Sequence, residues 1–362
     1  MSNSLRIVFH GNAFYGSTSV QRAEAFRQLG HAVTFVPKNG GLERETTLYR
    51  RLRFRLGYPC EVSDENRRLV EAVRATRPKV VWIEKSLTIW PETLRLIKKE
   101  LPPESRLVWF SADDMMNPRN QSAYWRQGLK LYDIHVTTKT PNVDELAHLG
   151  AKGIVFMPKS FDPQTHRPLE LSVQDQQRFA SDVAFVGGYE HERGESIEFL
   201  ASLGIPVRVW GPGWPRLGSR YPSLRIEGQP AFGEDYAKVI NAAKVMLCFL
   251  RKVNRDRQTA RSIEIPACGT FMLAERTEEH QALFQEGVEA VYFGSDEEMG
   301  AKVRYYLASK SERVRIAQAG RRRCFESGYS HASRLEAVLQ SCFSSKPDGC
   351  QDRPFHQVWR AV

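Results

Sequence analysis

The sequence predicts an α/β protein with two parallel sheets, and three features of the chain lead to this prediction. Short apolar runs without polar alternation, such as residues 5–9 and 107–110, are typical of strands buried on both faces of a sheet. Helical stretches that end at a glycine lie between such runs, as at Gly30 and Gly204. The opening strand, loop and helix also recur in the second half, where Gly187 corresponds to Gly11. We therefore expect two similar α/β units.

In the first half, we expect one helix that buries Ala25, Phe26 and Leu29 and another that starts near Asn142. The apolar runs around these helices predict strands over residues 5–9, 33–36, 80–83, 94–97, 107–110, 134–137 and 154–157.

Three prolines and the polar stretch 172–181 then interrupt the alternation, which predicts a linker. We expect an N-terminal domain over 1–160, a linker over 161–181, a C-terminal domain over 182–343 and a tail over 344–362 that packs back on the N-terminal domain. Within the C-terminal domain, strands are predicted over 182–188, 207–210, 245–250, 270–274 and 290–293, and helices over 192–203, 259–268, 278–285, 297–307, 311–324 and 331–343. The alternative is that strand–loop–helix units resemble one another in any α/β protein, without a repeat.

Composition narrows the class of protein and of partner. The 362 residues include 52 Lys and Arg against 42 Asp and Glu, a formal net charge of +10 that favours an anionic partner. Nucleic acid, phospholipid and a phosphorylated small molecule all meet that description. The 6 cysteines are scattered without a CxxC pair, which disfavours a structural zinc site. With no export signal and no apolar run of about 18 residues, we expect a cytoplasmic protein with free thiols.

The loop after the first predicted strand is rich in small residues. Gly11 and Gly16, followed by Ser17 and Thr18, have the spacing of a phosphate loop that lacks its lysine. This disfavours a nucleoside triphosphatase, and the absence of GxGxxG disfavours a dinucleotide oxidoreductase. Gly11 is therefore a candidate for close approach of a ligand in the cleft, and a plain strand-to-helix turn is the alternative.

The loop after residues 182–188 carries a second glycine pair. Gly187 and Gly188 permit a ligand to approach the main chain, and Arg193 follows in the first turn of the next helix. A cation there opposes the helix dipole, which favours a bound diphosphate as its counter-charge. A surface arginine is the alternative.

The segment 250–269 holds the densest group of candidate residues. If Thr259 caps the helix, Arg261 and Glu264 share a face near its start, with Lys252 in the preceding loop. Cations and helix amides suit phosphates, and a carboxylate suits the vicinal hydroxyls of a ribose. The pattern indicates a nucleotide site, and a surface salt bridge between Arg261 and Glu264 is the alternative.

These residues carry a resemblance to a known family. The stretch 261–269 (RSIEIPACG), with 273–279, 283–287 and 289–292, resembles the C-terminal domain of the CgeB-like (spore maturation protein-like) glycosyltransferases, GT-B enzymes of the group-1 class. The similarity extends back through 182–188 and Arg193 and forward through 313–320 and 329–331. Over the first 150 residues it rests on the fold pattern and on residues 109–114.

The resemblance implies a GT-B architecture of two facing Rossmann-like domains. A nucleoside diphosphate sugar would bind to the second domain and an unknown acceptor to the first, with no required metal or other cofactor. Group-1 enzymes carry two acids separated by seven residues, which implies Asp256 and Glu264 here, the second of them on the donor ribose. It also implies that Arg193 and Lys252 neutralise the donor diphosphate.

Candidates for proton transfer and acceptor contact remain in the first half. His10 ends a predicted strand on the cleft side and is the candidate catalytic residue there, together with Asp256 in the second half. A structural histidine is the alternative for His10. Asp113 and Asp114 follow a predicted strand and are interpreted as an acceptor-contacting pair or a helix cap rather than a metal motif.

The stretch between Arg44 and Arg55 mixes arginines with leucine and aromatic residues. It indicates a peripheral contact with a membrane surface or an acceptor, and a solvated basic loop is the alternative. Two other functions compete with glycosyl transfer. One is a non-catalytic two-domain protein that binds a nucleotide or a sugar. The other is nucleic-acid binding, which rests on charge alone and which we do not expect.

Overall fold

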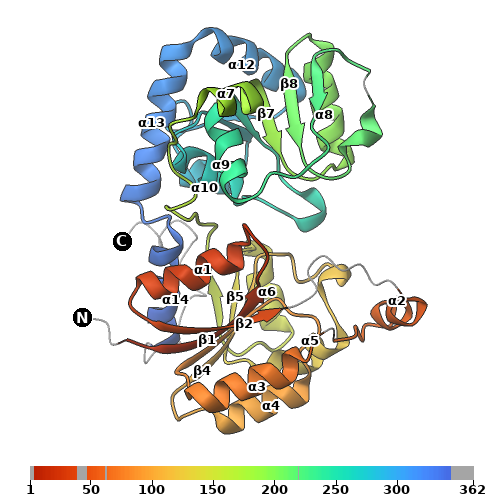
Figure 1. Ribbon diagram of the computed structural model, residues 1–362, viewed down its shortest axis with the longest axis vertical. Helices are drawn as coiled ribbons and strands as arrows, with labels where there is room; N and C mark the ends of the chain where they lie inside the picture. Colours follow the sequence, from red (N-terminus) through yellow and green to blue (C-terminus); the bar gives the residue numbers. More distant parts are fainter. Residues whose placement is uncertain (1–3, 39–46, 62, 219, 344–362) are drawn as a thin grey trace. The chain divides into compact units, whose positions relative to one another are not determined.

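The computed structural model describes residues 4–38, 47–61, 63–218 and 220–343. The chain divides into two compact units (Figure 1). Unit 1 contains the residues up to Pro158 and the segment that begins at His331, and unit 2 contains Lys159–Ser330. The expected tail over 344–362 and residue Arg44 lie outside the described residues.

Unit 1 is built on a six-stranded sheet whose strands all run parallel, in the order β2-β1-β3-β4-β5-β6. The order reverses between β1 and β3, so their carboxyl ends form the switch point at which such sheets bind ligands. The strands are β1 (Arg6–Asn12), β2 (Ala32–Lys38), β3 (Val80–Glu84), β4 (Arg106–Ser111), β5 (Ile134–Thr137) and β6 (Ile154–Phe156).

Helices cover both faces of this sheet (Figure 1). Side chains of α1 and α14, such as Phe26 and Leu335, share one buried cluster, whereas α3 and α4 contribute Leu69 and Leu94 to the other. The helices are α1 (Thr18–Gln28), α2 (Leu48–Arg55), α3 (Glu65–Thr76), α4 (Pro91–Glu100), α5 (Ala123–Gly128), α6 (Thr140–His148) and α14 (His331–Phe343).

Unit 2 has a second parallel six-stranded sheet, ordered β12-β11-β10-β7-β8-β9. Its first strand in the chain pairs with its fourth, which is the strand order of a Rossmann fold with the switch point between β7 and β10. The strands are β7 (Ser181–Val186), β8 (Val207–Trp210), β9 (Leu224–Ile226), β10 (Ala243–Cys248), β11 (Met272–Glu275) and β12 (Val291–Phe293). The helices are α7 (Val173–Phe179), α8 (His191–Ser202), α9 (Gly233–Ala242), α10 (Arg261–Ala267), α11 (Glu278–Leu283), α12 (Asp296–Ala308) and α13 (Lys310–Glu326).

Two local predictions are wrong. The apolar run 94–97, predicted as a strand, lies in α4, because Pro91 starts a helix whose face buries Leu94 and Ile97 while Leu96 is exposed. The polar stretch 172–181, predicted as a linker segment, contains α7, because the Ser172 hydroxyl caps it and Phe179 anchors it in the core of unit 2.

The domain limits also differ from those expected. Residues 161–181 belong to unit 2, and α14, expected in the C-terminal domain, buries Leu335 and Val338 against the unit 1 sheet. Within the described ranges, no helix is both long and apolar enough to cross a bilayer.

Candidate functional site

Glycines shape the loop after β7, which forms one side of the switch point of unit 2, and its contact with the loop after β8. The Gly187 carbonyl accepts a hydrogen bond from the Trp214 indole at 2.7 Å, and the Gly187 N–H donates to Trp210 at 2.9 Å. A Cβ atom on Gly211, whose φ is +142°, would lie 2.1 Å from that carbonyl oxygen. Only glycine therefore permits this close approach of the two loops.

Arg193 enters this switch point from the first turn of α8 and is buried. Its Nε donates to the Leu250 carbonyl and its Nη1 to the Gly188 carbonyl, both at 3.1 Å. Its ion pair with Glu190 is long, at 3.8 Å. Its Nη2 is buried without a hydrogen-bond partner in the described part of the chain. Burial and the nearby Arg261 lower the pKa of Arg193 to about 10.

Arg261 reaches the same place from the first turn of α10. Its Nη2 donates to the Phe249 carbonyl at 3.3 Å, and its guanidinium lies over the Phe185 ring, 5.3 Å from the centroid. Its Nε atom is also buried without a hydrogen-bond partner among the described residues. Two guanidinium groups with unused donors thus converge where a Rossmann sheet binds anions.

A pocket of about 180 Å³ within unit 2 is lined by Arg193 and by Phe249, whose carbonyl Arg261 contacts, but not by Arg261 itself. Ligand pockets usually measure about 300–1,000 Å³, so this one suits one part of a nucleotide rather than the whole. Its charged lining residues are Glu190, Glu192, Arg193, Lys252, Glu275, Arg276 and Asp296.

Glu275 is a pocket residue that the sequence analysis did not identify. Its Oε1 accepts a hydrogen bond from the Leu250 N–H at 2.8 Å, and burial raises the pKa of its carboxyl group. Its position directly after the predicted strand 270–274 was the signal that could have found it.

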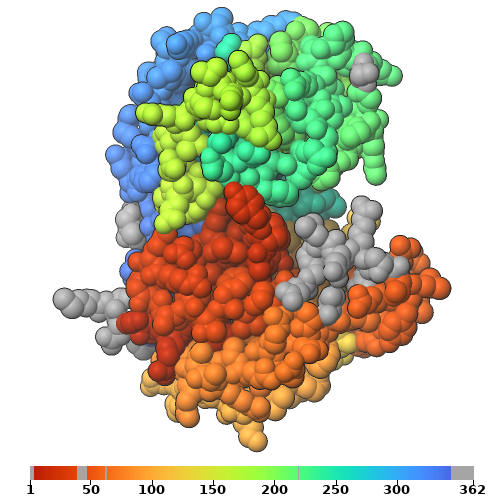
Figure 2. Space-filling view, viewed as in Figure 1, coloured from red at the N-terminus to blue at the C-terminus, as the bar shows by residue number. Residues whose placement is uncertain are grey.

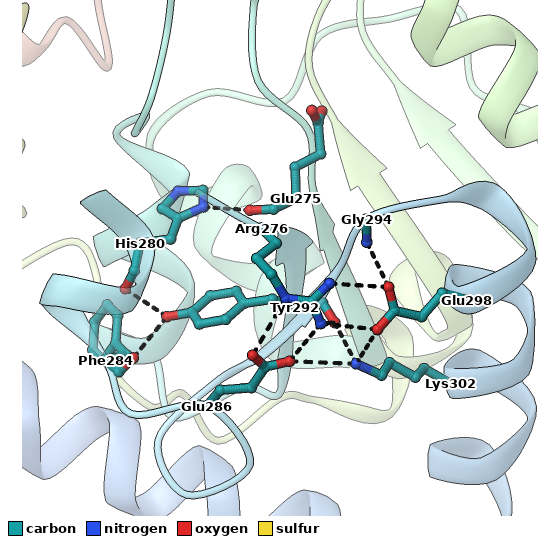
Figure 3. A network of polar contacts seen from close by, with 9 residues as sticks. All are labelled: Glu275, Arg276, His280, Phe284, Glu286, Tyr292, Gly294, Glu298 and Lys302. Atoms are coloured by element: carbon teal, nitrogen blue, oxygen red, sulfur yellow. Dashed lines mark hydrogen bonds and ion pairs between the residues drawn. The ribbon is translucent and has the colours of Figure 1, made fainter. Parts of the chain in front are cut away.

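A network of ion pairs supports the other side of the pocket (Figure 3). Arg276 pairs with Glu286 and Glu298 at 2.8 Å each, and Lys302 pairs with Glu298 at 2.7 Å. Glu298 also accepts the Gly294 N–H at 2.7 Å. The network therefore ties the loop after β11 to the loop after β12, while the Glu275 carboxylate points away from it.

Lys252 and Asp256 lie in the loop between β10 and α10. Lys252 is 65% exposed and pairs with Glu192 at 2.6 Å. Asp256 accepts a hydrogen bond from the Asn254 amide at 2.8 Å and is half-buried. Lys252 thus lines the pocket but is far more exposed than the two arginines.

Glu264 does not pair with Arg261. Its Oε2 accepts the Tyr236 hydroxyl at 2.6 Å, and its Oε1 lies 3.7 Å from His166 Nε2. All three side chains are largely buried, and burial with the Glu264 charge raises the pKa of Tyr236. Tyr236 and His166 were missed because they lie far from Glu264 in the sequence, on α9 and on the segment before α7.

Helix α10 begins at Arg261 rather than at the predicted Thr259, and Ala260 occupies the cap position without a side-chain hydrogen bond. A buried histidine holds the start of this helix instead. His280 donates from Nδ1 to the Glu275 carbonyl at 2.7 Å, so its Nε2 accepts the Ser262 hydroxyl at 2.6 Å.

His10 lies at the switch point of unit 1 and is fully buried. Its Nδ1 donates to the Val36 carbonyl at 3.1 Å, and its Nε2 lies 3.3 Å from Glu65 Oε2. Burial would raise the pKa of Glu65, but His10, Thr88 and Lys38 outweigh it and hold that pKa below its ordinary value. Nδ1 of His10 is thus hydrogen-bonded, whereas Nε2 lies near Glu65 but is buried without a hydrogen-bond partner among the described residues. The role of His10 in proton transfer stays a prediction.

The remaining first-half candidates are held by protein contacts. A Cβ on Gly11 would lie 2.9 Å from the Ser19 Cβ, so this glycine permits close packing of β1 against α1. Asp113 pairs with Lys85 at 2.6 Å. Asp114 is buried and accepts hydrogen bonds from the Met116 N–H and the Asn142 amide. Among the described residues, no group of three or more His, Cys, Asp and Glu side chains forms a metal site.

Comparison with known proteins bears on both units. Residues 193–340 match a protein family described as glycosyl transferase-like. The chain has no significant match among curated protein sequences.

Solved structures resemble the whole chain. A glycosyltransferase from Rickettsia africae aligns with a TM-score of 0.64 at 11% identity, over 95% of this chain and 100% of that one. Sucrose-phosphate synthase from Thermosynechococcus elongatus aligns with a TM-score of 0.60 at 14% identity, over 94% and 100%. Anabaena Alr3699/HepE, in complex with UDP and glucose, aligns with a TM-score of 0.60 at 12% identity, over 93% and 99%. The fold is that of the GT-B glycosyltransferases.

Proposed function

We propose that this chain is a GT-B glycosyltransferase that binds a nucleoside diphosphate sugar at the carboxyl edge of the unit 2 sheet. The observation that carries the proposal is the pair formed by buried Arg193 and half-buried Arg261. The Nη2 atom of the first and the Nε atom of the second are buried and lack hydrogen-bond partners among the described residues. A diphosphate would supply the acceptors that these donors lack.

The same two arginines would also contribute to catalysis through their positive charge. The bond between the sugar and the diphosphate breaks as a bond to an acceptor hydroxyl forms, so negative charge develops on the leaving diphosphate. Cations already fixed in a buried site stabilise that charge more strongly in the transition state than in the bound donor. We propose that Arg193 and Arg261 do this, with exposed Lys252 as an outer contact, and that no metal ion is required.

The other groups have proposed roles around the diphosphate. Glu264 would accept hydrogen bonds from the ribose, and the loop of Gly187 and Gly188 would pass close to the phosphates. Asp256, half-buried on the same unit, and His10 on unit 1 are the candidates for moving the acceptor proton. Gly11, Asp113 and Asp114 would shape the acceptor side.

The subfamily and the reaction class also remain part of the proposal. The stretch 261–269 that resembles the CgeB-like proteins lies inside the matched family region, which supports that subfamily. A hexosyl group is the proposed cargo, and UDP is the first nucleotide to test, because a GT-B neighbour was solved with UDP and glucose.

The decisive experiment combines binding and turnover on the full chain. Calorimetry should detect binding of one nucleoside diphosphate. The corresponding nucleoside diphosphate sugar should be hydrolysed slowly in the absence of an acceptor, both in EDTA and in Mg²⁺. Absence of binding to every common nucleoside diphosphate would overturn the proposal. Activity that disappears in EDTA and returns with Mg²⁺ would overturn metal independence alone.

A non-catalytic nucleotide-binding protein is the second candidate. One observation favours it: both ring nitrogens of buried His10, a candidate for moving the acceptor proton, face oxygen atoms of the protein itself. Tight binding of a nucleotide sugar without any hydrolysis or transfer, measured by release of the free nucleotide, would select this candidate.

A further inference from the structure

Helix α2 exposes an unusual amount of apolar surface. Four of its side chains, counting the residue just after its end, are more than half exposed: Leu48 at 85%, Tyr49 at 63%, Leu52 at 54% and Leu56 at 64%. None of the helix residues is buried. Clustered leucines in water are unfavourable, so such a face usually marks a binding surface.

The apolar and basic side chains of α2 form two neighbouring rows. Leu48, Leu52 and Leu56 recur every four residues and share one side of the helix. Arg51 and Arg55 each precede a leucine of this row and lie along its flank. Residues 47–60 contain no Asp or Glu. The α2 segment itself is therefore both apolar and positively charged.

Contacts with the rest of unit 1 hold α2 in place. The Arg53 guanidinium donates to the Tyr58 carbonyl at 3.0 Å and to the Tyr124 hydroxyl at 2.8 Å. The Tyr58 ring meets the Tyr124 ring at 5.4 Å, and the Gly57 carbonyl accepts the Ala123 N–H at 2.7 Å. These contacts anchor α2 beside α5, and the helix lies at the edge of unit 1 (Figure 1 and Figure 2). Its leucine row remains exposed there.

We propose that α2 is a docking surface for a bilayer that contains anionic phospholipids. The leucine row would enter the boundary between headgroups and acyl chains, and Arg51 and Arg55 would lie at the level of the phosphates. A second copy of the chain is a poorer occupant. Two such helices facing each other would bring their arginine rows together without a compensating carboxylate from residues 47–60. This inference is independent of the proposed transferase activity.

Vesicle co-sedimentation of the full chain tests the proposal. The chain should bind vesicles of phosphatidylcholine mixed with phosphatidylglycerol, and bind pure phosphatidylcholine vesicles much more weakly. The double variant Leu48→Ser/Leu52→Ser should bind the mixed vesicles at least about tenfold more weakly. Arg51→Gln/Arg55→Gln should bind the mixed vesicles about fivefold more weakly for each arginine removed. Added salt should reduce the difference in binding between this variant and the unchanged chain.

A matched control uses exposed leucines elsewhere on unit 1. Leu96→Ser/Leu149→Ser removes two side chains that are 45% and 46% exposed on α4 and after α6, and it should bind as the unchanged chain does. Circular dichroism and thermal melting of every variant report whether it is folded.

Two results would overturn the proposal. One is equal binding of the α2 variants and the unchanged chain to the mixed vesicles. The other is no binding of the unchanged chain to the mixed vesicles. If the chain then self-associates in sedimentation velocity and the α2 variants abolish this, the face is a contact between copies. A Tyr49→Trp variant adds a second readout. Mixed vesicles should shift its emission to shorter wavelength by more than they shift that of the unchanged chain, which already contains 7 tryptophans.

Discussion

Arg193 and Arg261 lie over the same aromatic ring, that of Phe185 at the end of β7, at 5.6 and 5.3 Å from its centroid. Each guanidinium also donates to a carbonyl just beyond β10, at Leu250 and Phe249. The aromatic ring and the two carbonyl groups hold the guanidinium groups in place but do not neutralise their charge. Burial and, after it, the repulsion between the like charges of Arg193 and Arg261 lower the pKa of Arg193. An anion bound between them would relieve this repulsion.

Replacing either arginine with methionine should weaken the binding of UDP by about 10-fold to 100-fold, because each removes a charge-assisted hydrogen bond from a buried site. Binding of uridine, which carries no phosphate, should change little. Calorimetry with both ligands on Arg193→Met and Arg261→Met gives the comparison.

Lys252→Met is the matched control for this pair. Its ammonium group is exposed and paired with Glu192, so its loss should cost less than either arginine. If Lys252→Met weakened UDP binding most, or if uridine binding fell as far as UDP binding, the diphosphate would not lie between the arginines.

The Glu264 carboxylate should distinguish ribose from deoxyribose. The unchanged chain should prefer UDP over 2′-deoxy-UDP by about tenfold, the worth of one hydrogen bond to a charged acceptor. Glu264→Ala should bring the ratio to about one. Tyr236→Phe, which removes the hydroxyl that holds Glu264 at 2.6 Å, should reduce the ratio in part.

Exposed Glu278 on α11 provides the control, since Glu278→Gln should leave the ratio unchanged. A ratio that stays at about ten in Glu264→Ala would mean that another group contacts the ribose.

The fold was predictable from the sequence largely because its strands are short, apolar and buried on both faces. Residues 245–250 and 290–293 illustrate this, since each overlaps a strand, β10 and β12. The prediction of a strand over 94–97 was wrong because a run of four apolar-rich residues does not distinguish a strand from one turn of a buried helix.

The candidate site was predictable only where chemistry and loop position coincide. Arg193 and Arg261 each follow a strand at the start of a helix, and the structure brings them together. Tyr236 and His166 meet Glu264 through tertiary packing of distant segments, which has no local signature in the sequence.

Two glycines of unit 2 should respond very differently to alanine, although both have positive φ. At Gly204, φ is +74° and no heavy atom lies within 4 Å of an added Cβ, so Gly204→Ala should cost about 1–2 kcal/mol from backbone strain alone. At Gly211, the Cβ would also meet the Gly187 carbonyl, which the Trp214 indole fixes.

Gly211→Ala should therefore cost more than about 3 kcal/mol, or displace the Gly187 loop and abolish UDP binding. Urea unfolding and calorimetry on the two variants measure both effects. Equal losses would show that the close approach to Gly187 is not required.

The stability of unit 2 should fall in mild acid because of His280. Burial lowers the pKa of His280 to about 4, from an ordinary value of 6.5, so the unfolded chain binds its proton first as the pH falls. This contribution is fully present above pH 6.5, is lost as the pH falls from 6.5 to 4, and changes no further below that. Its size is about 3 kcal/mol. Protonation would also place a donor on Nε2, where the Ser262 hydroxyl at the start of α10 now donates.

Urea unfolding at several pH values between 7.5 and 4.5 measures this dependence. Buried His135 in unit 1, whose pKa is also lowered to about 4 by burial, should add a similar slope. His280→Gln should therefore lose part of the slope, even where the lost hydrogen bonds lower its stability at pH 7.5. His148→Gln, which removes an exposed histidine, should retain the full slope. An unchanged slope in His280→Gln would mean that this ring accepts a proton in the folded state, and that the contact with Ser262 is not what holds the start of α10.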